Sequence, residues 1–469
     1  MEVGYYYSMH IEREQGLLPL ETLPEELRVS PAEQADYLDR QGILVETLPG
    51  NSILIATHRD TPDQQQTYVD SFLRVGYYDD PPHLMGITHL GEHMVFGGCL
   101  EVPNFEEQQR RFIYNGYRIE ARTQPFDVTL QLQASSGLTN PSLGIAAGIR
   151  NLASMAYQPL IDPLRMSYEK QLILDEYWMR LPSLPWHTGR AIAEALFAAD
   201  HVLQKIGTGD MESLDRITHE DLIRHVDSYF TPANTMIKMF SDGDRDKYEP
   251  QINLMREVWN EIASDHKGIR TRSPDFRKMS KSNMLDASSA YVKSVPFNKN
   301  RVCVSTAAVY DAGFYTKESF ALGLATGILS TDAFSLLRGS GIGYAPFVNL
   351  ANVPYTGTFT VQMGIEVDKS RYQELSVQLP TVLKTLIEQA LADGLPARRV
   401  EALYNAYADV PYSLNGRLQY AFDGLRIWNQ VIRSEDIEQS YRSVTDQDVA
   451  SWLRRFAEEP GALFIVGDI

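Results

Sequence analysis

The chain has 469 residues, which is too long for a single hydrophobic core, so two or more domains are expected. Its hydrophobic content of 43% and charged content of 22% are typical of a globular protein. A net charge of −18 argues against nucleic acid and anionic membrane surfaces as partners. Cys99 and Cys303 are the only cysteines, and neither a signal-like N-terminus nor a long apolar run is present, so we predict a cytoplasmic protein.

Residues 1–40 are acidic and proline-bearing, and we expect them to form an irregular lead-in segment. Beyond them, the apolar runs that flank Pro49-Gly50-Asn51 predict a β-hairpin. The Pro81-Pro82 pair excludes helix at its junction, so a helix carrying His89 and His93 can start only after it. Periodic stretches further predict strands at 67–76, 117–123 and 126–133, and helices at 104–114, at 143–157 and from Asp162-Pro163 through Glu176.

The second half of the chain repeats this order of elements. A strand at 359–365 is followed by a helix at 372–391, a Gly-Leu-Pro break and a helix at 397–408. Phe126 and Phe359 begin matching units at an offset of 233 residues (359 − 126), which indicates an internal duplication. We therefore predict an α+β fold of two homologous α/β sandwich domains, each a mostly antiparallel sheet with helices packed on it. Their predicted bounds are residues 1–264 and 285–469, joined by a polar linker at 265–284.

Residues 86–98 contain the order His-x-x-Glu-His, formed by His89, Glu92 and His93. Residues four apart on a helix are stacked neighbours, so the two imidazoles can bind one zinc ion. Glu92 is then placed to act as general base on a water at that ion, as in inverted-motif zinc peptidases. A pair of surface histidines held by the glutamate is the alternative that the pentapeptide alone leaves open.

A catalytic zinc site usually has three protein ligands, and a carboxylate is a common third. Glu169 and Glu176 are seven residues apart, or two helical turns, and so point to the same side of one predicted helix. One of them can bind the metal while the other orients a ligand or the water. Without the upstream motif, two solvated glutamates on a surface helix would be the preferred interpretation.

Together these segments resemble the metallopeptidase family of pitrilysin, insulin-degrading enzyme and mitochondrial processing peptidase. The family motif, roughly Gly-x-Ala-His-x-x-Glu-His-Met-x-Phe-x-Gly, is matched by residues 86–98, with Thr88 in place of the small residue. The family's glutamate pair, also seven apart, matches Glu169 and Glu176. The resemblance implies a zinc cofactor with Glu92 as catalytic base and Glu169 as its supporting residue. The implied ligands are His89, His93 and Glu176.

The family's edge strand, which holds the substrate backbone by β-addition, is similar to residues 116–123. Ala121 matches the family's alanine, whereas Glu120 replaces the usual asparagine. An anionic acceptor beside zinc would favour a basic substrate residue near the scissile bond, or would weaken turnover. Phe96 matches the family's aromatic residue beside the site, and core packing explains it equally well.

Residues 337–344 are similar to the family's Arg…Gly-x-Tyr element in the second domain. This similarity implies that Arg338 holds a substrate carbonyl or carboxylate, and that Tyr344 donates to the developing oxyanion. Both side chains would reach the substrate from across the chamber in which the family encloses it.

The resemblance also implies an assembly, because family members enclose substrate within four such domains from one long chain or two short ones. A two-domain chain is half of this clamshell. We expect a homodimer acting in trans, with a heterodimer of family paralogues as the rival. The predicted function is zinc-dependent endoproteolysis of unfolded peptides or precursor segments. The alternative is a non-catalytic, peptide-binding or structural subunit of a heterodimeric peptidase, and Glu120 is the one feature that favours it.

Overall fold

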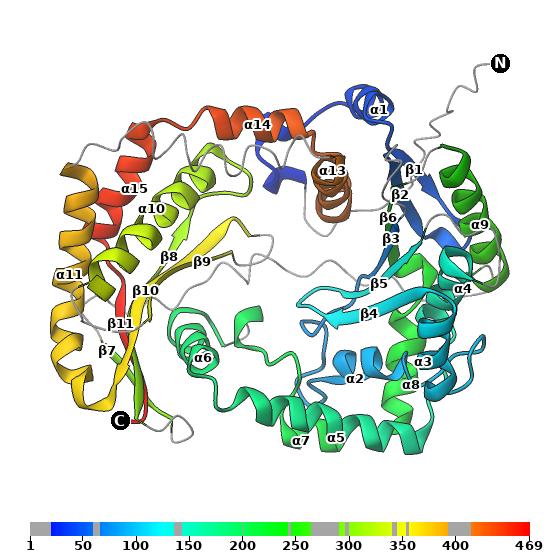
Figure 1. Ribbon diagram of the computed structural model, residues 1–469, viewed down its shortest axis with the longest axis horizontal. Coiled ribbons are helices and arrows are strands. Elements are labelled where there is room, and N and C mark those ends of the chain that lie inside the picture. Colours follow the sequence, from blue (N-terminus) through cyan, green and yellow to red (C-terminus); the bar gives the residue numbers. More distant parts are fainter. Residues whose placement is uncertain are drawn as a thin grey trace.

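The computed structural model describes residues 20–59, 66–135, 143–199, 201–242, 245–263, 290–295, 300–339, 345–352, 356–392 and 414–469. Within these residues, two β-sheets lie on opposite sides of the molecule, each packed with helices (Figure 1). The predicted α+β fold of two sandwich-like halves is confirmed. No described helix is both long enough and apolar enough to cross a membrane.

The first sheet has six strands in the order β1-β2-β6-β3-β5-β4, which places β4 at one edge. β1 and β2 form the predicted hairpin around Pro49–Asn51. The pair β2 and β6 is parallel, and every other pair is antiparallel. The strands are β1 (Leu44–Thr47), β2 (Ile53–His58), β3 (Gln66–Leu73), β4 (Tyr117–Thr123), β5 (Val128–Ser135) and β6 (Thr235–Ser241).

The second sheet has the order β7-β11-β8-β10-β9. Apart from β1, it repeats the first sheet, with one parallel pair followed by three antiparallel pairs. β5 and β10 occupy equivalent places, so the predicted internal duplication is confirmed. The strands are β7 (Ala290–Ser294), β8 (Arg301–Asp311), β9 (Ala345–Asn352), β10 (Thr358–Asp368) and β11 (Ala462–Gly467).

Helices cover one face of each sheet and form its main core. The larger core joins the first sheet to the helix that carries His89 and His93 and to helices that follow it in the chain. The other core joins the second sheet to α10, α11 and α15. The helices are α1 (Pro31–Arg40), α2 (Ile87–Met94), α3 (Phe105–Tyr114), α4 (Gly144–Tyr157), α5 (Pro163–Arg180), α6 (Leu184–Leu196), α7 (Met211–Arg216), α8 (His219–Tyr229), α9 (Arg245–Ala263), α10 (Lys317–Gly339), α11 (Tyr372–Ala392), α13 (Leu414–Trp428), α14 (Ser434–Arg442) and α15 (Asp446–Glu458).

On the second face of each sheet lies a further helix. In both cases this helix comes from the half of the chain that does not form the strands of that sheet. α6 packs on the second sheet, where Ile192 joins a cluster with Phe464. α13 packs on the first sheet, where the Phe422 and Phe72 rings lie 4.5 Å apart. The segments that contain α6 and α13 lie along the bottom and the top of Figure 1. Each sheet is therefore completed by the half of the chain that does not form its strands.

The prediction that residues 1–40 form an irregular segment is wrong in part, because Pro31–Arg40 form α1. Ser30 accepts a hydrogen bond from the Glu33 backbone, and Glu33 accepts one from Ser30 in return. This capping box, with Pro31 at the first helical position, satisfies amides that would otherwise lack partners. The predicted linker at 265–284 and the helix at 397–408 lie outside the described residues, and the domain bounds stay a prediction.

Candidate metal centre

Helix α2 begins at a tightly constrained turn. Gly86 precedes it with a φ of 93°, and a Cβ at this position would lie 2.7 Å from the carbonyl oxygen of Thr208. The Asp80 carboxylate accepts hydrogen bonds from the backbone N–H groups of Gly86 and Thr88, at 2.7 and 3.2 Å. The Thr88 hydroxyl also donates to Asp80, at 2.6 Å. These buried contacts satisfy the amides at the helix N-terminus and fix where the motif helix starts.

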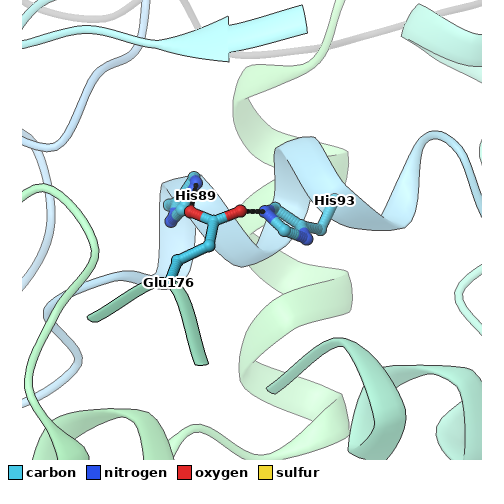
Figure 2. A group of neighbouring side chains, drawn as sticks. All are labelled: His89, His93 and Glu176. Carbon is cyan, nitrogen blue, oxygen red and sulfur yellow. Dashed lines mark ion pairs between the residues drawn. The ribbon is translucent and has the colours of Figure 1, made fainter. Parts of the chain in front are cut away.

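Three potential metal ligands converge on one point between α2 and α5 (Figure 2). Nε2 of His89 lies 3.8 Å from Glu176 Oε2, and Nε2 of His93 lies 3.6 Å from Glu176 Oε1. Two ligand atoms each about 2.1 Å from one zinc ion at a tetrahedral angle lie about 3.4 Å apart, so the two separations that involve Glu176 fit zinc. The neighbouring Asp175 is exposed and accepts a hydrogen bond from Gln171, so it is not part of this group.

The imidazole of His93 also contacts the carboxylate of Glu169, on the side of the ring away from Glu176. Its Nδ1 donates to Glu169 Oε2 at 2.9 Å, which leaves Nε2 directed at Glu176. The other oxygen of Glu169 forms an ion pair with Arg165, whose guanidinium carbon lies 4.3 Å from the centroid of the Phe105 ring. Such contacts set the tautomer and the orientation of a metal-binding histidine.

Burial and neighbouring charges set the protonation of the two histidines. Burial, with a further contribution from His93 and Arg180, lowers the pKa of His89 to about 3. Burial also acts to lower the pKa of His93, but the hydrogen bond to Glu169 and the surrounding carboxylates outweigh it and raise that pKa. His89 is therefore in the neutral form that binds metals.

Glu92 is placed to serve as a base beside these ligands. One of its oxygens lies 3.7 Å from His89 Nε2 and accepts a hydrogen bond from the Thr123 hydroxyl at 2.8 Å. Burial raises the pKa of Glu92, and this outweighs the opposing effects of His93 and Thr123. A carboxylate with a raised pKa is better matched to proton transfer near neutral pH. Because Thr123 ends β4, Glu92 also contacts the edge strand directly.

The other predicted site residues lie in different surroundings. Glu120 is exposed on β4 and forms an ion pair with Arg118, and Ala121 is half-buried. Phe96 is half-buried and packs against the main core of the first half. Arg338 lies in the last turn of α10, without a described side chain, and Tyr344 lies outside the described residues.

Sequence reasoning missed several residues that hold the site. Arg165 lies four residues before Glu169, and this helical spacing of opposite charges was a usable signal. Thr123 was noted only as part of the strand pattern. Asp80 and His225 gave no local signal, because they meet α2 from a loop and from α8.

His225 makes the stability of this region depend on pH. Its Nε2 lies 2.9 Å from the Thr88 hydroxyl, and burial lowers its pKa from 6.5 to about 4. Between these two pH values the unfolded chain binds a proton at His225 and the folded chain does not. The contribution of His225 to stability is therefore complete above about pH 6.5 and is lost as the pH falls toward 4. Between about pH 7.5 and about pH 5, the group should reduce the free energy of unfolding by about 2 kcal/mol.

Urea unfolding at these two pH values measures the effect. His225→Gln should lose correspondingly less stability on acidification than the wild type, and His83→Gln, at an exposed histidine, should lose as much as the wild type. An unchanged loss in His225→Gln would show that other groups cause the acid sensitivity.

Comparison with known proteins agrees with this geometry. No model of a protein family matches the sequence. The insulin-degrading enzyme of Drosophila melanogaster is 24% identical over 193 residues, which are 41% of this chain and 18% of that protein. Insulin-degrading enzyme-like 2 of Arabidopsis thaliana is 22% identical over 215 residues, which are 44% of this chain and 21% of that protein. The matched segments thus span about a fifth of these relatives.

Solved structures share the fold over most of the chain. The peptidase M16 inactive domain from Pseudomonas fluorescens has a TM-score of 0.70 at 13% identity, covering 91% of this chain and 98% of that one. A protease from Helicobacter pylori has a TM-score of 0.68 at 15% identity, covering 91% and 99%. Pitrilysin has a TM-score of 0.63 at 13% identity, covering 95% and 46%.

The fold and the cluster of two histidines and a glutamate define the class as a two-sheet half-clamshell of the M16 peptidase type. The fold of pitrilysin and the local similarity to insulin-degrading enzymes agree with the family resemblance that the sequence motifs predicted.

Proposed function

We propose that this protein is a zinc metalloendopeptidase that hydrolyses unfolded peptides or precursor segments. The observation that carries the proposal is the convergence of His89, His93 and Glu176 beside the buried carboxylate of Glu92. Two imidazoles, which bind metals in their neutral form, and one carboxylate make up a donor set that is common at catalytic zinc sites. Their separations of 3.6 and 3.8 Å leave room for an ion between them.

Each group has a distinct task in this reaction. His89, His93 and Glu176 would hold zinc, which when bound supplies Lewis acidity to the scissile carbonyl and to the attacking water. Glu92 takes a proton from that water and later delivers it to the leaving amine. The edge of β4, which pairs with no other described strand on that side, aligns the substrate backbone by main-chain hydrogen bonds. Arg338 and Tyr344 are proposed to hold the substrate carbonyl and the oxyanion.

Removal and return of the metal test the proposal. Dialysis against a chelator should abolish hydrolysis of an unfolded peptide, and one equivalent of zinc should restore it. The reason is that the proposed reaction depends on the Lewis acidity of the bound ion. Peptide turnover and zinc content are measured on the same samples. Hydrolysis that persists in the zinc-free protein would contradict the proposal.

We propose that two copies of the chain assemble into the complete enzyme. This chain matches 46% of the length of the pitrilysin chain, as expected for half of a clamshell. A homodimer is preferred because the zinc cluster and the Arg338/Tyr344 element occur in the same chain. A heterodimer with a paralogue is the rival, and the mass of the purified protein in solution, with any co-purifying chain, separates them.

A non-catalytic subunit is the second candidate function. It is favoured by the similarity to the inactive M16 domain, of which 98% is covered. The intact group of Glu92 and the three ligands argues against it, since catalysis is the role that this arrangement serves best. The zinc-dependent hydrolysis assay discriminates between the two candidates.

A further inference from the structure

Strand β4 presents a row of charged side chains along one face. Tyr117 and Ile119 are buried in the core, whereas Arg118, Glu120 and Arg122 are exposed. β4 is the last strand of its sheet, so the side opposite β5 pairs with no other described strand. A peptide strand added to this edge would place alternate side chains beside the charged row.

The charges in this row are not equally available to a substrate. Arg118 and Glu120 form an ion pair with each other. Arg122 is exposed and has no ion-pair partner within the described part of the chain. It immediately precedes Thr123, whose hydroxyl donates to Glu92 at 2.8 Å, so the Arg122 side chain leaves the opposite face of β4 from that contact. Arg122 is therefore the member of the row nearest in sequence to the contact with the catalytic base.

A second exposed guanidinium lies beside the site. On α5, the Arg180 side chain is 49% exposed, and its Nη2 lies 4.0 Å from Glu176 Oε2. Two carboxylates of the site are buried and engaged, since Glu92 binds Thr123 and Glu169 binds both His93 and Arg165, whereas Glu176 is partly exposed and faces both histidines and Arg180. Arg122 on β4 and Arg180 on α5 are thus exposed guanidinium groups on two elements that carry residues of the site, although the chain has a net charge of −18.

We infer that Arg122 selects substrates with an acidic side chain close to the scissile bond, on the strand that pairs with β4. The inference rests on the proposed peptidase function and names the substrate class of the same site. A guanidinium matches a carboxylate in charge and in bidentate geometry, and it repels lysine and arginine side chains. The preference is opposite to the one expected from Glu120 alone, because Arg118 already pairs with Glu120.

Charged residues on an edge strand also have a purely protective role, because they discourage pairing with other chains. Protection requires only that the row be charged, and it predicts no dependence of cleavage on the charge of the substrate. Substrate charge therefore separates the two roles.

The test uses the full-length zinc-loaded protein and peptides that are identical except at one position, which carries glutamate, glutamine or lysine. The position is varied over the two residues on either side of the cleaved bond. At one position, the wild type should cleave the glutamate peptide with a kcat/KM about tenfold above that of the lysine peptide. Arg122→Glu should reverse this order. Arg110→Glu, an equal change of charge at an exposed position on α3, should leave the order unchanged.

The outcomes distinguish this inference from the function on which it rests. Equal cleavage of the three peptides at every position, or a glutamate preference that survives Arg122→Glu, would overturn the inference and leave the peptidase function standing. A failure of the wild type to cleave any peptide would overturn the proposed function and the inference together.

Discussion

Glu92→Gln is expected to lower kcat/KM for peptide hydrolysis by about 10²–10⁴-fold while zinc remains bound. Glutamine has nearly the same shape and still accepts the hydrogen bond from Thr123, but it cannot take a proton from water. The three ligand side chains are left intact, so metal binding should change little. Initial rates on one unfolded peptide, with zinc content measured in parallel, give both quantities.

A matched glutamate controls for the loss of a negative charge. Glu220 lies on α8 with an exposed side chain, so Glu220→Gln should hydrolyse the peptide at the wild-type rate. If Glu92→Gln were as active as the wild type, the observed hydrolysis would come from another group or another protein.

Arg426→Met is expected to lower the free energy of unfolding by about 3–5 kcal/mol. Arg426 on α13 pairs with Asp127 at 3.0 Å, and both residues are buried. The substitution would leave the Asp127 charge buried without this partner, and a buried unpaired charge is costly. The contact also joins the helix from the second half to the turn that follows β4, where Thr123 holds Glu92.

Urea unfolding of single and double variants measures this pair. Adding Asp127→Asn to Arg426→Met removes the stranded charge, so the double variant should be more stable than Arg426→Met alone. If Arg426→Met unfolds at the wild-type urea concentration, the buried pair does not join the two halves.

The cluster of His89, His93 and Glu176 could be predicted from the sequence because its spacing within each helix is local. Helical periodicity places His89 and His93 on one face of α2, and a seven-residue spacing places Glu169 and Glu176 on one face of α5. The roles of the two glutamates needed the structure. It directs Glu176 at both histidines and places Glu169 behind His93.

The contacts between the halves could not be predicted, because nothing local encodes them. Amphipathic helices such as α6 and α13 show that they bury a face, but not which sheet they cover. The same holds for Asp80 and His225, which meet Thr88 across 8 and 137 residues of sequence. The duplication was visible from the repeated order of strand and helix, whereas the exchange of helices between halves depends on tertiary packing alone.

Zinc content of purified variants tests the central claim most directly. The wild type and Asp175→Asn should each hold one zinc ion per chain, because Asp175 points away from the cluster to Gln171. Glu176→Gln should lose most of its zinc, because it removes one of three ligands and leaves the two histidines. A wild type that binds no zinc, or a Glu176→Gln variant that binds it as tightly as Asp175→Asn, would contradict a zinc centre formed by His89, His93 and Glu176.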